Sequence, residues 1–261
     1  MKIHCLIENT SSGPELVAEH GLSLLIETGA HRILFDAGAS PAFAENAARM
    51  GLDLGRVDAA VLSHGHYDHG GGMLRFLELN PHSTVWASPH AAEPHFNAAG
   101  KDIGLPAELA RHERFRPVPD AVFTLAPGIT LHTAGTVPQA YPTPPNGMST
   151  LQGNTHVPDD FRHELYLLIE ENGRRVLFSG CSHRGILNIT AHFRPDILVG
   201  GFHLMRTPLQ ELPAVADALA QFHTHYYTGH CTGDPAFNFL KSTLREQLNS
   251  FSSGSSIEIC L

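Results

Sequence analysis

Four side chains that can bind metal ions lie close together in the stretch Leu62–Gly70, namely His64, His66, Asp68 and His69. Neutral imidazoles and carboxylates are ligands that suit zinc, manganese and iron. Alternate side chains of an extended segment share a face, so His64 and His66 can bind one ion. If the chain turns after them, Asp68 and His69 can face a second ion nearby. The pattern H-x-H-x-D-H therefore predicts a metal site.

The elements around this stretch agree with that reading. An apolar run, Val57–Leu62, is broken only by Asp58 and predicts a buried strand. Three glycines, residues 70–72, follow the motif, and the apolar spacing from Met73 to Leu77 predicts a helix. The chain has 19 His, so chance pairs are expected. Chance does not readily place this pattern at the end of a buried strand with glycines behind it.

The motif resembles the signature of the metallo-β-lactamase superfamily. The resemblance implies an α/β fold, the four-layer αββα sandwich, formed as a single domain over residues 1–261. It also implies one or two metal ions at the edge of the sandwich.

The rest of the chain fits this layout. Apolar runs predict strands at 2–7, 22–27, 32–35, 84–87, 122–125, 129–133, 164–171, 175–179, 196–199 and 257–261. Apolar spacing and helix-start residues predict helices at 40–51, 186–193, 207–219 and 235–248. Asn172-Gly173 predicts a hairpin turn. Residues 137–160, rich in Pro and Gly, are expected to form a long loop near the site, either a wall for the substrate or a surface insertion.

Two departures from the superfamily pattern concern the ligands. Hydrolases of the superfamily commonly have H-T-x-G-H where this chain has Thr136, so one imidazole is missing. They also have Gly-Asp at the end of a later strand, where this chain has Cys181. Thiolate can replace carboxylate on zinc, although a buried Cys is often only part of a core. His183, two residues on, is the candidate for the missing imidazole.

Three further residues are candidates at strand ends. His230 resembles the final metal-binding His of the superfamily. His203 follows a strand and is a ligand, a proton donor or a substrate contact. Asp36 matches an acidic position behind the metal loop, but it is equally a turn-forming Asp before Gly.

Four segments indicate which group within the superfamily the chain resembles. They are L-S-H-G-H-Y-D-H-G-G-G, G-C-S-H-R-G-I-L-N-I, G-G-F-H-L and H-C-T-G. They resemble the group of 7,8-dihydropterin-6-methyl-4-(β-D-ribofuranosyl)aminobenzene-5'-phosphate synthases and related metal-dependent hydrolases. In that group the same two departures occur. The named activity joins a pterin methyl diphosphate to a ribosyl-aniline phosphate.

Composition limits the partners. The net charge of −9 disfavours nucleic acid, whose phosphates require a basic surface. No apolar run approaches the roughly 20 residues of a membrane span, and no signal peptide is visible. The four cysteines form no CxxC pair. We therefore expect a cytoplasmic protein with a small-molecule substrate, phosphorylated or not; the sequence sets no oligomeric state.

The resulting hypothesis is a metal-dependent, hydrolase-like enzyme with one or two divalent ions, zinc before manganese or iron. His64, His66 and His183 would hold one ion, and Asp68, His69 and His230 the other, with Cys181 between or beside them. Asp68 can instead act as a general base. The alternatives are an alkyl transferase of the pterin type, a non-catalytic metal- or ligand-binding protein, and a redox site in which Cys181 lies beside iron.

Overall fold

The computed structural model describes residues 1–143 and 147–260. The chain divides into two compact units, each described by itself. Unit 1 comprises residues 1–119, 147–163 and 251–260; unit 2 comprises the described parts of 120–146 and 164–250. The single domain expected over the whole chain stays a prediction. None of the helices in the described ranges is long and apolar enough to cross a membrane.

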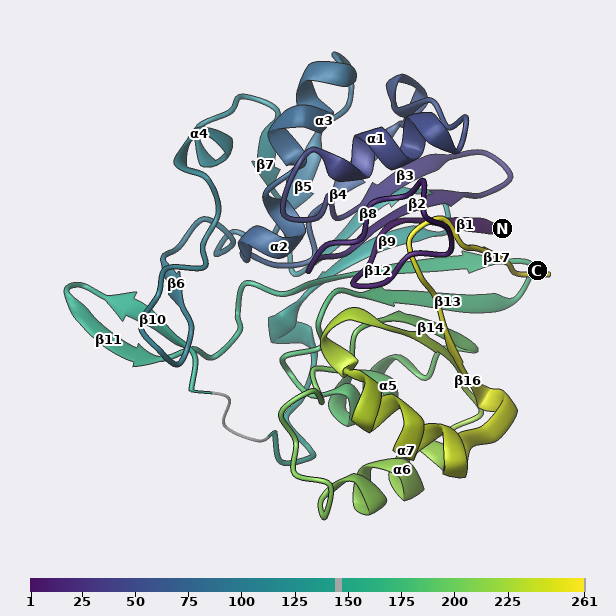
Figure 1. The fold of residues 1–261 in the computed structure, drawn as a ribbon. Coiled ribbons are helices and arrows are strands. Elements are labelled where there is room, and N and C mark those ends of the chain that lie inside the picture. The colour runs from purple at the N-terminus through teal and green to yellow at the C-terminus, as the bar shows by residue number, and fades with distance from the viewer. Residues whose placement is uncertain (144–146, 261) are drawn as a thin grey trace. The chain divides into compact units, whose positions relative to one another are not determined.

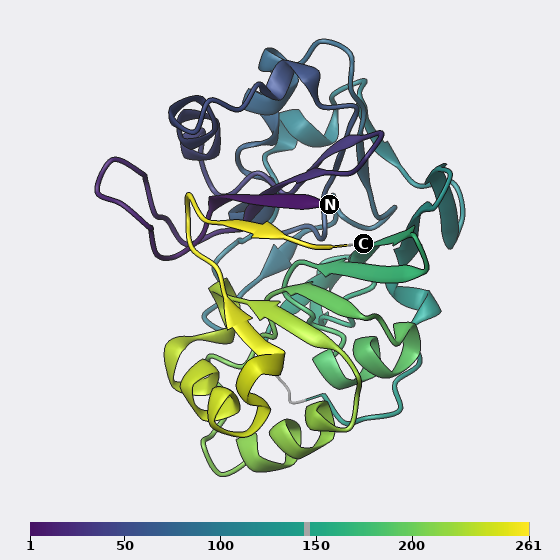
Figure 2. The same ribbon diagram turned by 90° about the vertical axis from the view of Figure 1, so that its right-hand side faces the viewer.

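Unit 1 is built on a seven-stranded sheet with the order β17-β1-β2-β3-β4-β5-β7. The strands are β1 (Lys2–Ile7), β2 (Ser23–Glu27), β3 (Arg32–Phe35), β4 (Ala59–Val61), β5 (Val85–Ala87), β7 (Phe115–Pro117) and β17 (Ser256–Glu258). The pairs from β17 to β3 are antiparallel, and those from β3 to β7 are parallel. The last strand pairs with the first, as Figure 2 shows, so the predicted C-terminal edge strand is confirmed.

Helices of unit 1 cover one face of this sheet (Figure 1). They are α1 (Ala42–Arg49), the 3-10 turn η1 (Leu54–Arg56), α2 (Tyr67–Gly70), α3 (Met73–Leu79) and α4 (Ala107–Ala110). Phe43 of α1 and Phe76 of α3 pack in one core with Leu6, Leu34 and Ala60 from the strands. Burying such side chains stabilises the sheet beneath the metal loop by roughly 1.5–3 kcal/mol each.

The expected long loop at 137–160 is wrong for residues 149–158. These residues form a hairpin of β10 (Ser149–Gln152) and β11 (Thr155–Pro158), and β10 pairs with β6 (His95–Phe96). Alternation of apolar and polar residues in β10 and β11 is too short to stand out among the Pro and Gly residues around it. Pro144 and Pro145, part of the expected loop, lie outside the described residues.

Unit 2 has a second seven-stranded sheet, with the order β16-β15-β14-β13-β12-β9-β8. Its strands are β8 (Val122–Ala126), β9 (Ile129–Thr133), β12 (Leu165–Glu171), β13 (Arg174–Ser179), β14 (Ile197–Gly200), β15 (His225–Thr228) and β16 (Leu248–Ser250). The strands β13 to β16 are parallel. Asn172 and Gly173 have φ of 51° and 76°, so the predicted hairpin turn is confirmed.

Helices α5 (Ile186–Phe193), α6 (Leu212–Ala220) and α7 (Asp234–Leu244) lie together on one face of this sheet (Figure 1). Three 3-10 turns complete the unit: η2 (Ala134–Thr136), η3 (His230–Thr232) and η4 (Arg245–Gln247). The prediction for 186–193 is confirmed. The helix expected from residue 207 begins later, with a proline in its first turn, and the one expected to reach 248 ends at 244.

In each unit the parallel strands carry the candidate residues at their carboxyl ends, where ligands bind in open α/β sheets. In unit 1, β3 leads into Asp36 and β4 into His64. In unit 2, the adjacent strands β13, β14 and β15 lead into Cys181, His203 and His230.

Candidate metal centre

The predicted metal loop follows β4 and is almost entirely buried. His64 lies before the cap residue of α2, His66 is that cap residue, and Asp68 and His69 lie within α2. The ring of His64 has its centroid 4.5 Å from that of His66 and 4.1 Å from that of His69. Unit 1 thus brings the three imidazoles of the predicted motif together.

A buried carboxylate lies behind this loop. Asp36 accepts hydrogen bonds from the Ser63 backbone N–H (2.7 Å) and from the Ser63 hydroxyl (2.7 Å). Its Oδ2 lies 2.6 Å from Nδ1 of His69. A neutral His69 therefore carries its proton on Nδ1 and directs an unprotonated Nε2 away from Asp36. The turn after β3 also requires φ of 59° at Asp36, a conformation that Asp tolerates better than most residues.

Asp68 has a partner that the sequence did not suggest. Nε2 of His20 lies 3.3 Å from Oδ2 of Asp68, and the His20 side chain is half exposed. Asp68 is also 3.9 Å from Nε2 of His69. The polar stretch before β2 showed only an isolated His, so spacing could not have indicated this pair.

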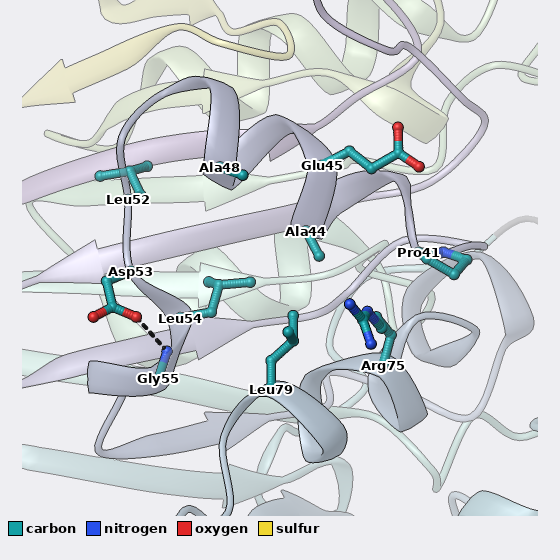
Figure 3. Close-up of a pocket in the computed structure, with 10 residues that line it drawn as sticks. All are labelled: Pro41, Ala44, Glu45, Ala48, Leu52, Asp53, Leu54, Gly55, Arg75 and Leu79. Atoms are coloured by element: carbon teal, nitrogen blue, oxygen red, sulfur yellow. Dashed lines mark hydrogen bonds between the residues drawn. The ribbon is translucent and has the colours of Figure 1, made fainter.

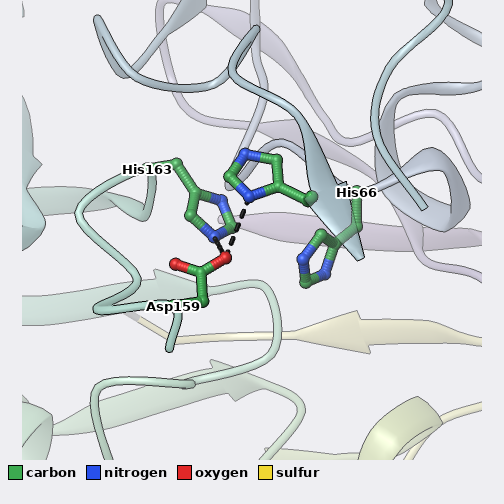
Figure 4. A group of neighbouring side chains, drawn as sticks. His66, Asp159 and His163 are labelled. Carbon is green, nitrogen blue, oxygen red and sulfur yellow. Dashed lines mark hydrogen bonds and ion pairs between the residues drawn. The ribbon is translucent and has the colours of Figure 1, made fainter. Parts of the chain in front are cut away.

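A second group of polar side chains borders the loop from β6 and from the segment after β11. Ligand atoms of His66, His95, Asp159 and His163 all lie within 4.8 Å of one another. Figure 4 shows Asp159 and His163 side by side, with His66 facing them. Asp159 Oδ2 lies 2.9 Å from Nδ1 of His95 and 3.4 Å from Nε2 of His163.

His163 also holds the backbone of the metal loop, because the Gly65 N–H donates to its Nδ1 at 3.0 Å. Gly65 is needed at this point: a Cβ there would lie 2.2 Å from the Ala91 carbonyl oxygen. Sequence reasoning missed this group, since its members come from distant parts of the chain.

Burial favours the neutral form of His66 and of His163 by lowering the pKa of each. It is the main cause that lowers the pKa of His66, and the charge of His163 lowers that pKa further. Burial likewise lowers the pKa of His163, although the hydrogen bond to Asp159 opposes this shift. Burial alone would raise the pKa of Asp159, but hydrogen bonds from His163 and His95 outweigh it and hold that pKa well below its usual range. The group therefore combines neutral nitrogen donors with a carboxylate.

In unit 2, Cys181, His230 and Cys231 have ligand atoms within 4.8 Å of one another, and all three residues are buried. The Cys231 thiol donates to the Cys181 carbonyl at 3.6 Å and accepts from the His203 N–H at 3.3 Å. Cys231 does not continue a strand, because β15 ends at residue 228 and η3 begins at His230 with φ of 50°.

His183 and His203 also come together in unit 2, with ring centroids 4.3 Å apart. Both line a cavity of about 380 Å³, to which Arg206, Thr207 and Ser182 contribute. The turn that carries His183 is fixed by a buried carboxylate, Glu164, which accepts from the His183 and Arg184 N–H groups and from the Tyr166 hydroxyl. Burial raises the pKa of Glu164.

A larger hollow of about 440 Å³ lies elsewhere on unit 1, between α1 and α3. Figure 3 shows Ala44 and Ala48 of α1 across from Arg75 and Leu79 of α3. Its lining holds neither His nor Cys, so size alone does not indicate the site of chemistry.

Comparison with known proteins identifies the family. Residues 16–151 match the family model of the metallo-β-lactamase superfamily. The chain belongs to this superfamily. It is 28% identical to an uncharacterised protein of Methanocaldococcus jannaschii, over 95% of both chains. It is also 28% identical to the 7,8-dihydropterin-6-methyl-4-(β-D-ribofuranosyl)-aminobenzene-5'-phosphate synthase of the same organism, over 99% of this chain and 96% of that one.

Solved structures agree with the expected α/β fold. The crystal structure of Tm1679, a metal-dependent hydrolase of the β-lactamase superfamily, matches with a TM-score of 0.86 and 26% identity over 99% of both chains. Zinc-bound PqqB from Methylobacterium extorquens matches with a TM-score of 0.61 and 13% identity, over 99% of this chain and 100% of that one. The latter likeness concerns the fold alone.

The residues of the predicted loop fit a divalent ion. His69 is oriented by a carboxylate in the way that metal-binding imidazoles usually are. His64 and His66 converge beside it, and Asp68 adds a hard oxygen donor. The corresponding group of unit 2 offers two sulfurs and one imidazole, which favour zinc.

Proposed function

We propose that the chain is a metal-dependent enzyme that acts on a small molecule, with one or two divalent ions, zinc first, held by the loop after β4. The observation that carries this proposal is the hydrogen-bond network from Ser63 through Asp36 to His69. A buried carboxylate that fixes the tautomer of an imidazole raises its basicity as a ligand and keeps it in place. The superfamily membership supports the same reading.

We also propose Cys181, His183 and His230 as ligands. Cys181 and His230 lie where the resemblance to the superfamily implies metal ligands, and His183 is the candidate for the imidazole that is missing at Thr136. Elemental analysis of the purified wild-type protein, with Cys181→Ala and His183→Ala beside it, tests this set. Loss of metal in a variant supports its residue as a ligand. Unchanged metal content contradicts the assignment for that residue.

A bound divalent ion would lower the pKa of a water molecule and polarise a phosphate or carbonyl oxygen of the substrate. Asp68 has the position of a general base, since its carboxylate belongs to the loop and is linked by His20 to the surface. A proton taken up by Asp68 can pass to the half-exposed imidazole of His20. We expect Asp68→Asn to lower turnover by about 10²–10⁴-fold.

The cavity beside His183 and His203 supplies a place for an anionic group of the substrate. Arg206 brings a positive charge to its lining and Glu211 a negative one, and Thr207 and Ser182 bring hydroxyl groups. A guanidinium and hydroxyl groups are donors that phosphate groups accept. A phosphorylated substrate therefore fits the proposal.

Two proteins that this chain resembles carry names that favour different reactions. One is named a hydrolase, and the other a synthase whose name indicates transfer to an aminobenzene. Water labelled with heavy oxygen separates them. The metal-loaded protein is incubated with generic phosphate and carboxylate esters, and separately with a pterin methyl diphosphate and an aniline acceptor. A hydrolase places the label in its product, whereas a transferase releases unlabelled diphosphate and forms a carbon–nitrogen bond.

We place hydrolysis first because the crystal structure of the metal-dependent hydrolase matches this chain with a TM-score of 0.86 over 99% of both chains. Formation of the coupled product would favour the transferase instead. A protein that binds metal tightly and turns over none of these compounds would contradict the enzymatic proposal and favour a metal-binding role.

A further inference from the structure

His95 is a buried imidazole that the proposed ligand set does not use. It lies in β6, which pairs with β10, and it is 1% exposed. Its Nδ1 is 2.9 Å from Oδ2 of Asp159, whose side chain is 2% exposed. A carboxylate accepts hydrogen bonds only, so a neutral His95 carries its proton on Nδ1 and leaves a lone pair on Nε2.

That Nε2 has no hydrogen-bond partner among the residues that the structure describes. A buried polar atom without a partner costs about 1–3 kcal/mol, so native proteins seldom retain one without a reason. Nε2 faces the metal loop: it would lie 2.8 Å from a Cβ placed on Gly65. The ring of His66 is 5.5 Å away between centroids, at an interplanar angle of 77°.

His163, the other imidazole beside Asp159, is occupied differently. Its Nδ1 accepts the Gly65 N–H, so in a neutral ring Nε2 carries the proton; this nitrogen lies 3.4 Å from Asp159 and makes no hydrogen bond among the described residues. In that tautomer His163 has no free lone pair to offer a metal ion, whereas His95 has one. Its ring packs on that of His95 with centroids 3.8 Å apart, which holds His95 in place.

We propose that Nε2 of His95 is a ligand of the metal ion bound by His66, with Asp159 as the carboxylate that orients it. The inference rests on the proposed function, since His66 is shared. It assigns to unit 1 the imidazole that the chain lacks at Thr136. The sequence suggested His183 for that imidazole, but with His95 in this role His183 is not required to complete the ligands of this ion.

The group is compact enough for this assignment. Two nitrogens on one tetrahedral zinc ion, each about 2.0–2.1 Å from the metal, are about 3.3 Å apart. His66, His95, Asp159 and His163 each have one possible ligand atom, for a His either ring nitrogen, within 4.8 Å of the others. The arrangement Asp159–His95–metal repeats the arrangement Asp36–His69 on the other side of the loop.

Metal titration of the full chain tests the inference. The protein is stripped with a chelator and titrated with Zn²⁺ against a competing chromophoric chelator. We expect His95→Gln to weaken the tightest site about 100-fold or more, and Asp159→Asn to weaken it about 10–100-fold. His4→Gln is the matched control, because His4 is also buried and bonded to a carboxylate, that of Glu27; its zinc affinity should equal that of the wild type.

A second measurement uses the wild-type protein and so tests the inference even if a variant loses stability. In nitrogen-15 spectra of the wild-type protein, zinc should shift Nε2 of His95 while Nδ1 keeps its proton. An Nε2 resonance unchanged by zinc would overturn the inference, as would wild-type affinity in His95→Gln with a loss only in His183→Gln. In those cases the proposed function still stands. A wild-type chain that binds no zinc at all would overturn both.

Discussion

Replacing Asp36 with Asn tests whether the buried carboxylate prepares His69 for metal. The amide keeps the shape of the side chain but has only one acceptor oxygen. If that oxygen faces the Ser63 N–H, the amide nitrogen faces the Ser63 hydroxyl and Nδ1 of His69. Nδ1 must then lose its proton to accept a hydrogen bond, and the proton moves to Nε2, the atom that has to bind metal.

The size of the effect follows from these contacts. A hydrogen bond to a charged group contributes about 1.5–3 kcal/mol, and Asp36→Asn removes the one that selects the His69 tautomer. Since 1.4 kcal/mol corresponds to a factor of about ten, metal affinity should fall by about 10–150-fold. The metal-free protein should also lose about 1–3 kcal/mol of unfolding free energy, because hydrogen bonds to a charged carboxylate are replaced by weaker ones to a neutral amide.

Competition with a chromophoric chelator gives the affinity, and urea unfolding of the metal-free protein gives the stability. Asp58→Asn is the control, since Asp58 accepts from the Arg32 N–H, has an exposed side chain and lies before β4 rather than after it. It should change neither quantity by more than about 0.5 kcal/mol. An Asp36→Asn protein that binds zinc as tightly as the wild type would refute the reasoning about His69.

Three further predictions concern the same unit. Gly65→Ala places a Cβ 2.2 Å from the Ala91 carbonyl oxygen, so the loop must shift and zinc affinity should fall; equal affinity in the titration would contradict the close approach. Phe43→Ala should lower the unfolding free energy in urea by about 3–5 kcal/mol with zinc stoichiometry unchanged, and a loss below about 1 kcal/mol would show that the core does not depend on it. Burial lowers the pKa of His66 and His163, so below about pH 6.5 these imidazoles bind protons more readily in the unfolded chain than in the folded one. The metal-free protein should therefore lose up to about 1.4 kcal/mol of unfolding free energy per pH unit for each group. An unfolding free energy that stays constant from pH 7 to 5.5 would exclude this effect.

Most of the fold and half of the candidate site could be predicted from local patterns in the sequence. The strand before His64 and the turn at Asn172-Gly173 were predictable because each depends on neighbours within a few residues. The resemblance to the superfamily suggested Asp36 as a residue behind the loop, with a turn-forming Asp as the equal alternative. Its contact with His69 completes that interpretation.

The residues that border the loop from β6 and β11 were not predictable in this way. His95 and Asp159 are 64 positions apart, and Gly65 and His163 are 98 apart. The hairpin that brings Asp159 near His95 lies in a stretch whose prolines and glycines resemble a loop. The pairing of β10 with β6 joins these segments, and no local spacing reveals a strand pairing of that range.

The same physical arrangement occurs on both sides of the metal loop. Asp36 accepts from the Nδ1 atom of His69, and Asp159 accepts from that of His95, so two buried carboxylates select the tautomers of two imidazoles. Each ring is fixed through its Nδ1 atom by a carboxylate of the fold itself, so the cost of ordering these side chains is met by the protein's own hydrogen bonds. Metal binding then requires little further ordering, which favours affinity. The conformation at Asp36, with φ of 59°, is part of that cost, about 1–3 kcal/mol, and its three hydrogen bonds are sufficient to offset it.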